Sequence, residues 1–309
     1  MSESSFRPSP PAREMARFAG RDDRRAFAAI AGDWAIVILV AVLAEQVRGA
    51  LEGPLAWPLA WLTAAAVIAG RQTAMLNLTH AAAHRALFRR VRWNEGLDVL
   101  YALPIADTVA HYRGPHLEHH REITERRANR FEFLHDTLGL PGRGPWGRAW
   151  VVFLRPLLGH AAWGMILGTV KDARRDRTYG ERLLAFWVPL VAVAAPFGAL
   201  RPLLCYWVVP LLWLHPVFLL WGEVSDHFRA PGGTRDHTGL FHAAICNGHG
   251  LYHDVHHRYA FIPFYREREA ALHLAHLGRA APQCSRSALD FVRRIFGEVA
   301  VDAPPPAHP

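Results

Sequence analysis

Four long apolar segments separate this chain from ordinary soluble proteins. They cover approximately residues 29–47, 55–79, 183–200 and 202–221. About 20 predominantly apolar residues are needed to cross the hydrocarbon core of a bilayer, and each segment comes close to that length. A short turn separates the members of each pair, and tryptophans such as Trp57 and Trp221 lie near segment ends, where indole rings prefer the membrane interface. The sequence therefore predicts an all-α integral membrane protein with four transmembrane helices arranged as two hairpins.

Arginine is distributed unevenly around these segments. Six arginines precede residue 29, sixteen lie between His84 and Leu183, and nine follow Trp221, whereas each hairpin turn carries one. Positively charged loops are retained on the cytoplasmic side of a membrane. We therefore expect both termini and the middle segment to be cytoplasmic, and we expect the protein to lie in a bacterial inner membrane.

The remaining composition argues against several other classes of protein. The net charge is +8 and the isoelectric point is near 10.0, but no zinc-finger spacing and no interleaving of aromatic and basic residues accompanies it, so nucleic-acid binding is not expected. The three cysteines, Cys205, Cys246 and Cys284, are too widely spaced to form a disulfide framework or a CxxC metal site. Residues 1–28 are expected to be a disordered cytoplasmic lead-in, 29–277 the membrane domain, and 278–309 a cytoplasmic tail.

Eight histidines in three clusters are the main chemical signal. The clusters read HAAAH, HLEHH and HDVHH, and their histidines are His80 and His84, then His116, His119 and His120, then His253, His256 and His257. Neutral imidazole is a favoured ligand for iron, copper, nickel and zinc. Residues three or four apart share one face of a helix, so each cluster is expected to present its rings to one point. Eight rings from three distant segments exceed the needs of one metal and predict two metal ions side by side, held in a cytoplasmic helical cap.

Four further residues are candidates near these clusters. His227, at the cytoplasmic end of the fourth apolar segment, is the candidate ninth ligand, because ionisable residues at membrane depth are usually functional. Glu223 lies one turn earlier and is a possible ligand or water-mediated partner. Asp254 is expected to accept a hydrogen bond from a ligand imidazole. His249 precedes His253 by four residues and is expected to have a supporting role in the loop.

Three other metal chemistries fit these residues poorly. A zinc protease needs a glutamate beside its first histidine, where this chain has Ala81. A di-iron carboxylate bundle needs two Glu-x-x-His pairs, and Glu132–His135 alone has that spacing. A metal transporter would place histidines along its membrane segments, whereas the eight cluster histidines lie outside them. An all-histidine pair of irons that activates O2 remains.

The order and flanks of the clusters resemble one known family. HxxxH, HxxHH and HxxHH, with Leu78-Thr79 before the first cluster, Tyr112-Arg113 before the second and Tyr252 before the third, are similar to the membrane fatty acid desaturase/hydroxylase family over approximately residues 29–277. The resemblance implies that all eight cluster histidines are iron ligands and that His227 is the additional one. The chain departs from the family pattern at Ala81, where many relatives have an acidic residue, and in the spacing of Glu223–His227.

The resemblance implies O2-dependent oxidation of an unactivated C–H bond in a lipid-like substrate, most simply fatty acyl desaturation. Hydroxylation or ketolation of a lipid, carotenoid or specialised metabolite is the alternative, and a non-catalytic metal-binding membrane scaffold is the second. No haem or iron–sulfur domain is apparent in the sequence. A separate electron donor, such as a ferredoxin, rubredoxin or cytochrome b5-like protein, is therefore expected to dock on the arginine-rich face.

Overall fold

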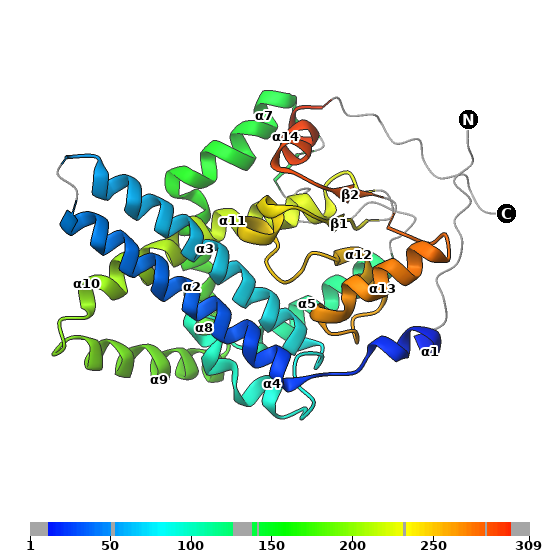
Figure 1. Ribbon diagram of the computed structural model, residues 1–309, viewed down its shortest axis with the longest axis horizontal. Coiled ribbons are helices and arrows are strands. Elements are labelled where there is room, and N and C mark those ends of the chain that lie inside the picture. The colour runs from blue at the N-terminus through cyan, green and yellow to red at the C-terminus, as the bar shows by residue number, and fades with distance from the viewer. Residues whose placement is uncertain are drawn as a thin grey trace.

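The computed structural model describes residues 12–50, 53–125, 138–140, 142–230, 233–281 and 283–297. These residues are mostly helical, and two long antiparallel helices, α2 (Asp23–Ala50) and α3 (Ala56–Ala83), run side by side through the molecule (Figure 1). Each is long and apolar enough to cross a membrane, and together they match the first two predicted spans. At 1.5 Å per residue, a 28-residue helix exceeds the ~30 Å hydrocarbon thickness, so one end of α3 can extend beyond the lipid.

A third spanning helix runs from Leu200 to His227 and contains the predicted fourth apolar segment. It consists of α10 (Leu200–Leu203), the π-helical turn η6 (Leu204–Val208) and α11 (Val209–His227). Pro216 lies inside α11, which nevertheless continues as a helix to His227. The two ends that later carry histidines, the last turn of α3 and the last turn of α11, therefore both belong to spanning helices.

The predicted span over 183–200 differs from the structure. Helix α9 (Arg177–Ala194) ends inside it, and a turn with Gly198 at φ +68° follows, so no helix covers the predicted range. Instead, a bent pair of helical segments, Pro145–Leu154 and Pro156–Arg175, is long and apolar enough to cross a membrane, and the two segments meet at 43°. The first segment is formed by α7 (Pro145–Ala149) and η4 (Trp150–Leu154). The second is formed by η5 (Pro156–His160) and α8 (Ala161–Arg175). Among the described residues there are thus three straight candidate spans, or four if the bent pair crosses. The predicted pair of simple hairpins is not reproduced.

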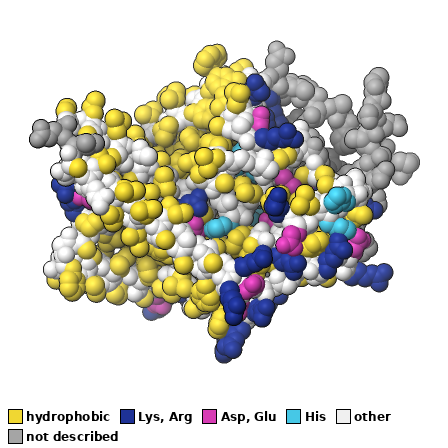
Figure 2. Space-filling model, in the orientation of Figure 1, with side chains coloured by type: hydrophobic (Ala, Val, Ile, Leu, Met, Phe, Trp, Pro, Cys, Tyr) yellow, Lys and Arg dark blue, Asp and Glu magenta, His cyan; other side chains and the backbone are white. Residues whose placement is uncertain are grey.

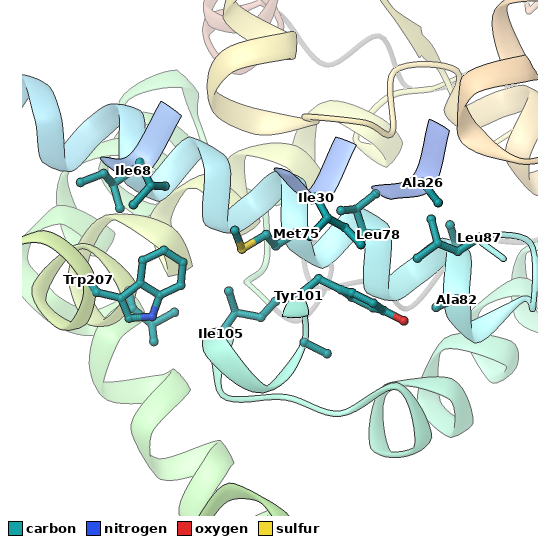
Figure 3. Close-up of a cluster of buried hydrophobic side chains, with 14 of the residues drawn as sticks. Ala26, Ile30, Ile68, Met75, Leu78, Ala82, Leu87, Tyr101, Ile105 and Trp207 are labelled. Carbon is teal, nitrogen blue, oxygen red and sulfur yellow. The ribbon is translucent and has the colours of Figure 1, made fainter. Parts of the chain in front are cut away.

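The main core packs between α2, α3 and the segment that follows α3. That segment contains α4 (Trp93–Gly96), η2 (Asp98–Leu100) and η3 (Leu103–Ile105). Figure 3 shows Met75 and Leu78 of α3 lying among Ile30, Tyr101 and Ile105. In the same cluster the indoles of Trp34 and Trp207 stack at 4.7 Å between centroids, which connects α2 to η6. This core fixes α3, and with it the first histidine cluster.

The surface has two different halves. Large apolar side chains are exposed along the spanning helices, including Leu39 at 56% and Leu59 at 61%, and they form the extensive hydrophobic area in Figure 2. Exposure of this apolar surface to water is unfavourable, whereas its contact with lipid is favourable. Arginine and carboxylate side chains gather on the other half (Figure 2), around α13 (Phe264–His276) and the chain before α2. The protein is therefore a membrane protein with a polar cap at one end.

The cap contains α5 (Val109–Glu125), the π-helical turn η7 (His242–Cys246), α12 (His253–Arg258) and α13. A two-residue parallel pairing, β1 (Asp236–His237) with β2 (Cys284–Ser285), leads into α14 (Ala288–Phe296), so the predicted tail begins with ordered structure. The predicted disordered lead-in is likewise shorter, because α1 (Ala12–Met15) and η1 (Ala16–Phe18) bury Met15 and Phe18 against the cap and α2 already starts at Asp23. Burial of these two side chains offsets the loss of chain entropy. Residues 1–11 and 298–309 lie outside the described residues.

Candidate metal centre

The histidine clusters sit at the ends of two spanning helices and on two cap helices. His80 lies in the last turn of α3 and His84 directly after its end. His227 is the last residue of α11. The second cluster lies in α5, which begins at Val109 and contains Pro115. Proline lacks an N–H and usually interrupts a helix, and here α5 continues through it.

The structure brings all nine candidate ligands together in two groups. The first contains His80, His84, His116, His120 and His256, and the second contains His119, His227, His253 and His257. Within each group, one ligand atom from every ring lies within 4.8 Å of the others. The arrangement supplies two adjacent places where a metal ion could bind.

Helix geometry explains how the clusters are divided. Successive residues on an α-helix differ by about 100°, whereas residues four apart differ by about 40°. On α5, His116 and His120 are four apart and join the first group, while His119 turns to the second. On α12, His253 and His257 join the second group while His256 turns to the first. The expectation that each cluster points at one place therefore holds for HxxxH only, because adjacent histidines in HxxHH serve different groups.

The ring nitrogens are spaced as ligands of one ion are. In the first group, His84 Nε2 lies 2.8 Å from His116 Nε2 and 3.2 Å from His120 Nε2. In the second, His253 Nε2 lies 3.0 Å from the Nε2 atoms of both His227 and His257. Two imidazoles at right angles on one ion, with bonds of about 2.1 Å, place their nitrogens about 3 Å apart. Lone pairs that face each other at this distance repel unless a proton or a cation lies between them, so the donor set fits a metal.

Burial keeps the rings in the form that binds metal. Desolvation lowers the pKa of His84 to about 4, with Arg113 adding to the effect, and lowers the pKa of His120 to about 3. The pKa values of His253, His256 and His257 are held well below the ordinary value, again chiefly by burial. At neutral pH these imidazoles are uncharged, and neutral imidazole is the ligand that metals require.

The second ring nitrogens have different partners in the two groups. His227 Nδ1 donates to the Gly233 carbonyl at 2.7 Å, which leaves Nε2 as the lone-pair nitrogen. His256 Nδ1 lies 3.4 Å from Glu267, and His253 Nδ1 lies 3.9 Å from Asp226. A carbonyl or carboxylate at this position commonly orients a ligand imidazole.

The role predicted for Asp254 is wrong. Its carboxylate accepts from the Thr234 hydroxyl at 2.8 Å and pairs with Arg258, so it holds the chain around α12 together and does not contact a ligand ring. Residue 254 follows His253 directly on α12 and therefore points away from both groups. Glu267, which sequence reasoning missed, occupies the position expected for Asp254. It belongs to the run Tyr-Arg-Glu-Arg-Glu, which is typical of a solvated helix face.

The other two candidates lie outside the ligand groups. His249 Nε2 lies 3.0 Å from Asp33 Oδ2 in α2, and Asp33 also pairs with Arg71 at 3.1 Å, so these contacts join the turn before α12 to α2 and α3. Glu223 is half-buried on α11, one turn before His227, and is not a member of either group.

The turn before the third cluster is pressed against α3. Gly248 has φ +48°, and a Cβ there would lie 2.6 Å from Ala74 Cα. Asn77 Nδ2 donates to the Asn247 carbonyl, and Asn247 Nδ2 donates to Asp226 at 2.7 Å. Glycine is required where the backbone has positive φ and approaches another backbone this closely. The turn thereby fixes α12, and its three histidines, relative to the ends of α3 and α11.

Together, the apolar helices and the histidine groups define a membrane protein with two adjacent groups of possible metal ligands at one end of its helices. The model of the fatty acid desaturase family matches residues 54–284. Dihydrorhizobitoxine desaturase from Bradyrhizobium elkanii is 25% identical over 224 residues, which cover 64% of this chain and 63% of that protein. The chain thus spans less than two thirds of the length of that relative.

The chain belongs to the fatty acid desaturase family. Its two histidine groups are the part of the described structure that could hold metal ions.

Proposed function

We propose that the protein uses two irons and O2 to oxidise an unactivated C–H bond of a lipid-like substrate, most simply by fatty acyl desaturation. The five histidines of the first group would hold one iron, and the four of the second group the other. The observation that carries the proposal is the division of nine histidine rings into two adjacent groups. A reduced iron pair supplies, when bound, activation of O2 with electrons from outside the protein.

The chain itself positions and isolates this centre. The ends of α3 and α11 hold His80 and His227 on elements fixed by the membrane core, while α5 and α12 each contribute to both groups. A site built on rigid helices keeps its ligands in place through the reaction. Burial of the rings excludes water, which would otherwise compete for the oxidising species.

Substrate and electrons are expected to reach the centre from different sides. The exposed apolar belt of the spanning helices favours a substrate that partitions into lipid. The arginine-rich cap favours an acidic donor protein such as a ferredoxin, rubredoxin or cytochrome b5-like carrier. The distribution of arginine supports an orientation with both termini and the histidine groups in the cytoplasm of a bacterial cell.

Desaturation is favoured over hydroxylation because the curated relative is named as a desaturase. That name concerns dihydrorhizobitoxine, so a specialised metabolite with an alkyl segment is a second class of substrate to test. Removal of two hydrogens and insertion of one oxygen differ in how the carbon chain is held beside the metals.

Mass spectrometry of cells that express the protein with a donor system tests the proposal. Lipids or metabolites lighter by two hydrogens support desaturation, and products heavier by one oxygen support hydroxylation. A matched strain that expresses His256→Ala should show neither product while the variant still inserts in the membrane. Unchanged cellular function in that strain, with no product in either strain, would favour a non-catalytic metal-binding scaffold.

A further inference from the structure

Glu267 is a buried carboxylate directed at the first histidine group. It lies in the first turn of α13 with 3% of its surface exposed, and its Oε1 atom is 3.4 Å from His256 Nδ1. Its Oε2 atom is buried and has no hydrogen-bond partner within the described residues. Among the described residues, His256 is also the single ion-pair partner of Glu267.

An unpaired buried carboxylate is costly in a protein interior. Removing such a group from water without a partner carries a penalty of several kcal/mol. Neighbouring positions of α13 do not share this environment, because Glu269 is exposed and pairs with Arg266 at 3.1 Å. A cation close to Glu267 would offset this cost and keep its carboxylate charged.

The surroundings of Glu267 indicate where the compensation comes from. Glu267 lines a small cavity with room for about one water molecule, together with His80, His253 and His256, which come from both histidine groups. Nine histidine side chains bring no negative charge to two metal cations. A carboxylate beside this cavity would offset part of that positive charge and would be stabilised by it in turn.

We propose that Glu267 is a positioning residue of the metal centre: it accepts the Nδ1–H of His256, fixes Nε2 toward the first metal, and supplies negative charge to a ligand set that otherwise has none. The inference rests on the proposed function in that it needs a metal in the first group. Two other acidic residues near the ligand rings, Asp254 and Asp226, already have partners: Asp254 pairs with Arg258, and Asp226 is bonded to His237 and Asn247.

The test compares Glu267→Gln with Glu269→Gln in the full-length protein, purified in detergent after iron-replete expression. The first change keeps the size of the side chain and removes its charge. The second makes the same change two residues away, on the exposed face of the same helix. Loss of a partner of a ligand histidine typically weakens metal binding 10–100-fold. We expect Glu267→Gln to lose iron to a chelator roughly 10–100-fold faster than wild type, and Glu269→Gln to match wild type.

Mössbauer spectroscopy supplies a readout that a packing role would not change. Glu267→Gln should alter the signal of the iron in the first group, which contains His256, and leave that of the second group unchanged. Equal iron retention and identical spectra in Glu267→Gln and wild type would overturn the proposal. Parallel changes at both irons, with a lower unfolding temperature, would also overturn it, because they would show a structural role.

Failure of this inference is distinguishable from failure of the proposed function. If the wild-type protein binds no iron, the proposed function is wrong and Glu267 has no metal to compensate. If the wild-type protein binds two irons and Glu267→Gln holds both as firmly, the function stands and only the role of Glu267 is wrong.

Discussion

The two histidine groups are built from the same cap helices but differ in how they are anchored. The first has five rings, two of them from the end of α3, and the Glu267 carboxylate stands beside His256. The second has four rings, one of them from the end of α11, and its His227 is oriented by the Gly233 carbonyl. The first group therefore has five possible ligands, one more than the second, which has four. We expect the second group to be the more sensitive of the two to loss of a ligand.

Removal of one ring from each group tests this difference and should give the largest effect. His227→Ala leaves three rings in the second group, whereas His84→Ala leaves four in the first, the number that the second group has naturally. We expect His227→Ala to abolish product formation and reduce iron to about one per chain. This effect on metal binding is larger than the roughly 10–100-fold loss of affinity that follows removal of a residue hydrogen-bonded to a ligand histidine. Iron analysis and product assays would measure both variants. Equal iron loss in the two variants would contradict the proposed asymmetry.

Loss of the contacts that hold α2, α3 and the turn before α12 together should instead affect both histidine groups alike. Asp33 is 2% exposed and binds Arg71 of α3 and His249, which lies in the turn before α12. Removal of one partner of a buried ion pair typically costs about 3–5 kcal/mol. Asp33→Ala should lower the unfolding temperature strongly and reduce iron in both groups together. Arg48→Gln, which removes an exposed pair with Glu45, should cost at most about 1 kcal/mol and serves as the control.

The contact between α3 and η7 provides a smaller test of the same support. A Cβ at Gly70 would lie 1.9 Å from the Ala244 carbonyl oxygen, so Gly70→Ala must separate α3 from η7. Overpacking of this kind typically costs about 1–3 kcal/mol. Gly32→Ala, where a Cβ meets nothing within 4 Å, should be neutral or slightly stabilising because alanine favours helix. The unfolding temperatures of both variants would test this difference. Equal values would show that α3 and η7 pack less closely at Gly70 than the distances indicate.

Acid should weaken the fold through the buried rings of both groups. The pKa of His120 is about 3 and that of His84 about 4 in the folded protein, against an ordinary value of 6.5. Below pH 6.5 the unfolded chain takes up protons that the folded rings do not, so the stability is fully present above that pH and is lost as the pH falls toward 4. Unfolding temperature measured against pH should show this decline. A stability that rises as the pH falls over the same interval would contradict the burial of neutral imidazoles.

Sequence patterns were sufficient for the features that depend on local periodicity. Two of the four predicted spans coincide with α2 and α3, a third lies within Leu200–His227, and all nine candidate histidines lie in the two groups. The bent pair from Pro145 to Arg175 was missed because Pro156, Gly159 and six charged residues interrupt its apolar pattern. The predicted 183–200 span failed because a run of apolar residues does not reveal a turn at Gly198.

The residues that contact the ligand histidines or hold their helices in place could not be predicted from local sequence patterns, because tertiary contacts determine them. Asp254 lies within the third cluster yet points to Thr234 and Arg258, whereas Glu267 lies on a separate helix within a charged run and reaches His256. Likewise, the pairing of Asp33 with Arg71 and His249 joins residues far apart in the chain. The assignment of each histidine ring to one of the two groups follows from the rotation of about 100° per residue, once α5 and α12 are known to be continuous helices at these positions.

The most direct test of the account is the metal content of the detergent-purified protein, with iron, zinc and manganese counted per chain after iron-replete expression. Two adjacent all-histidine groups predict close to two irons, and a sharp fall in His227→Ala, which leaves three rings in the second group. A single zinc, or no metal at all after anaerobic handling, would contradict a di-iron centre at this site.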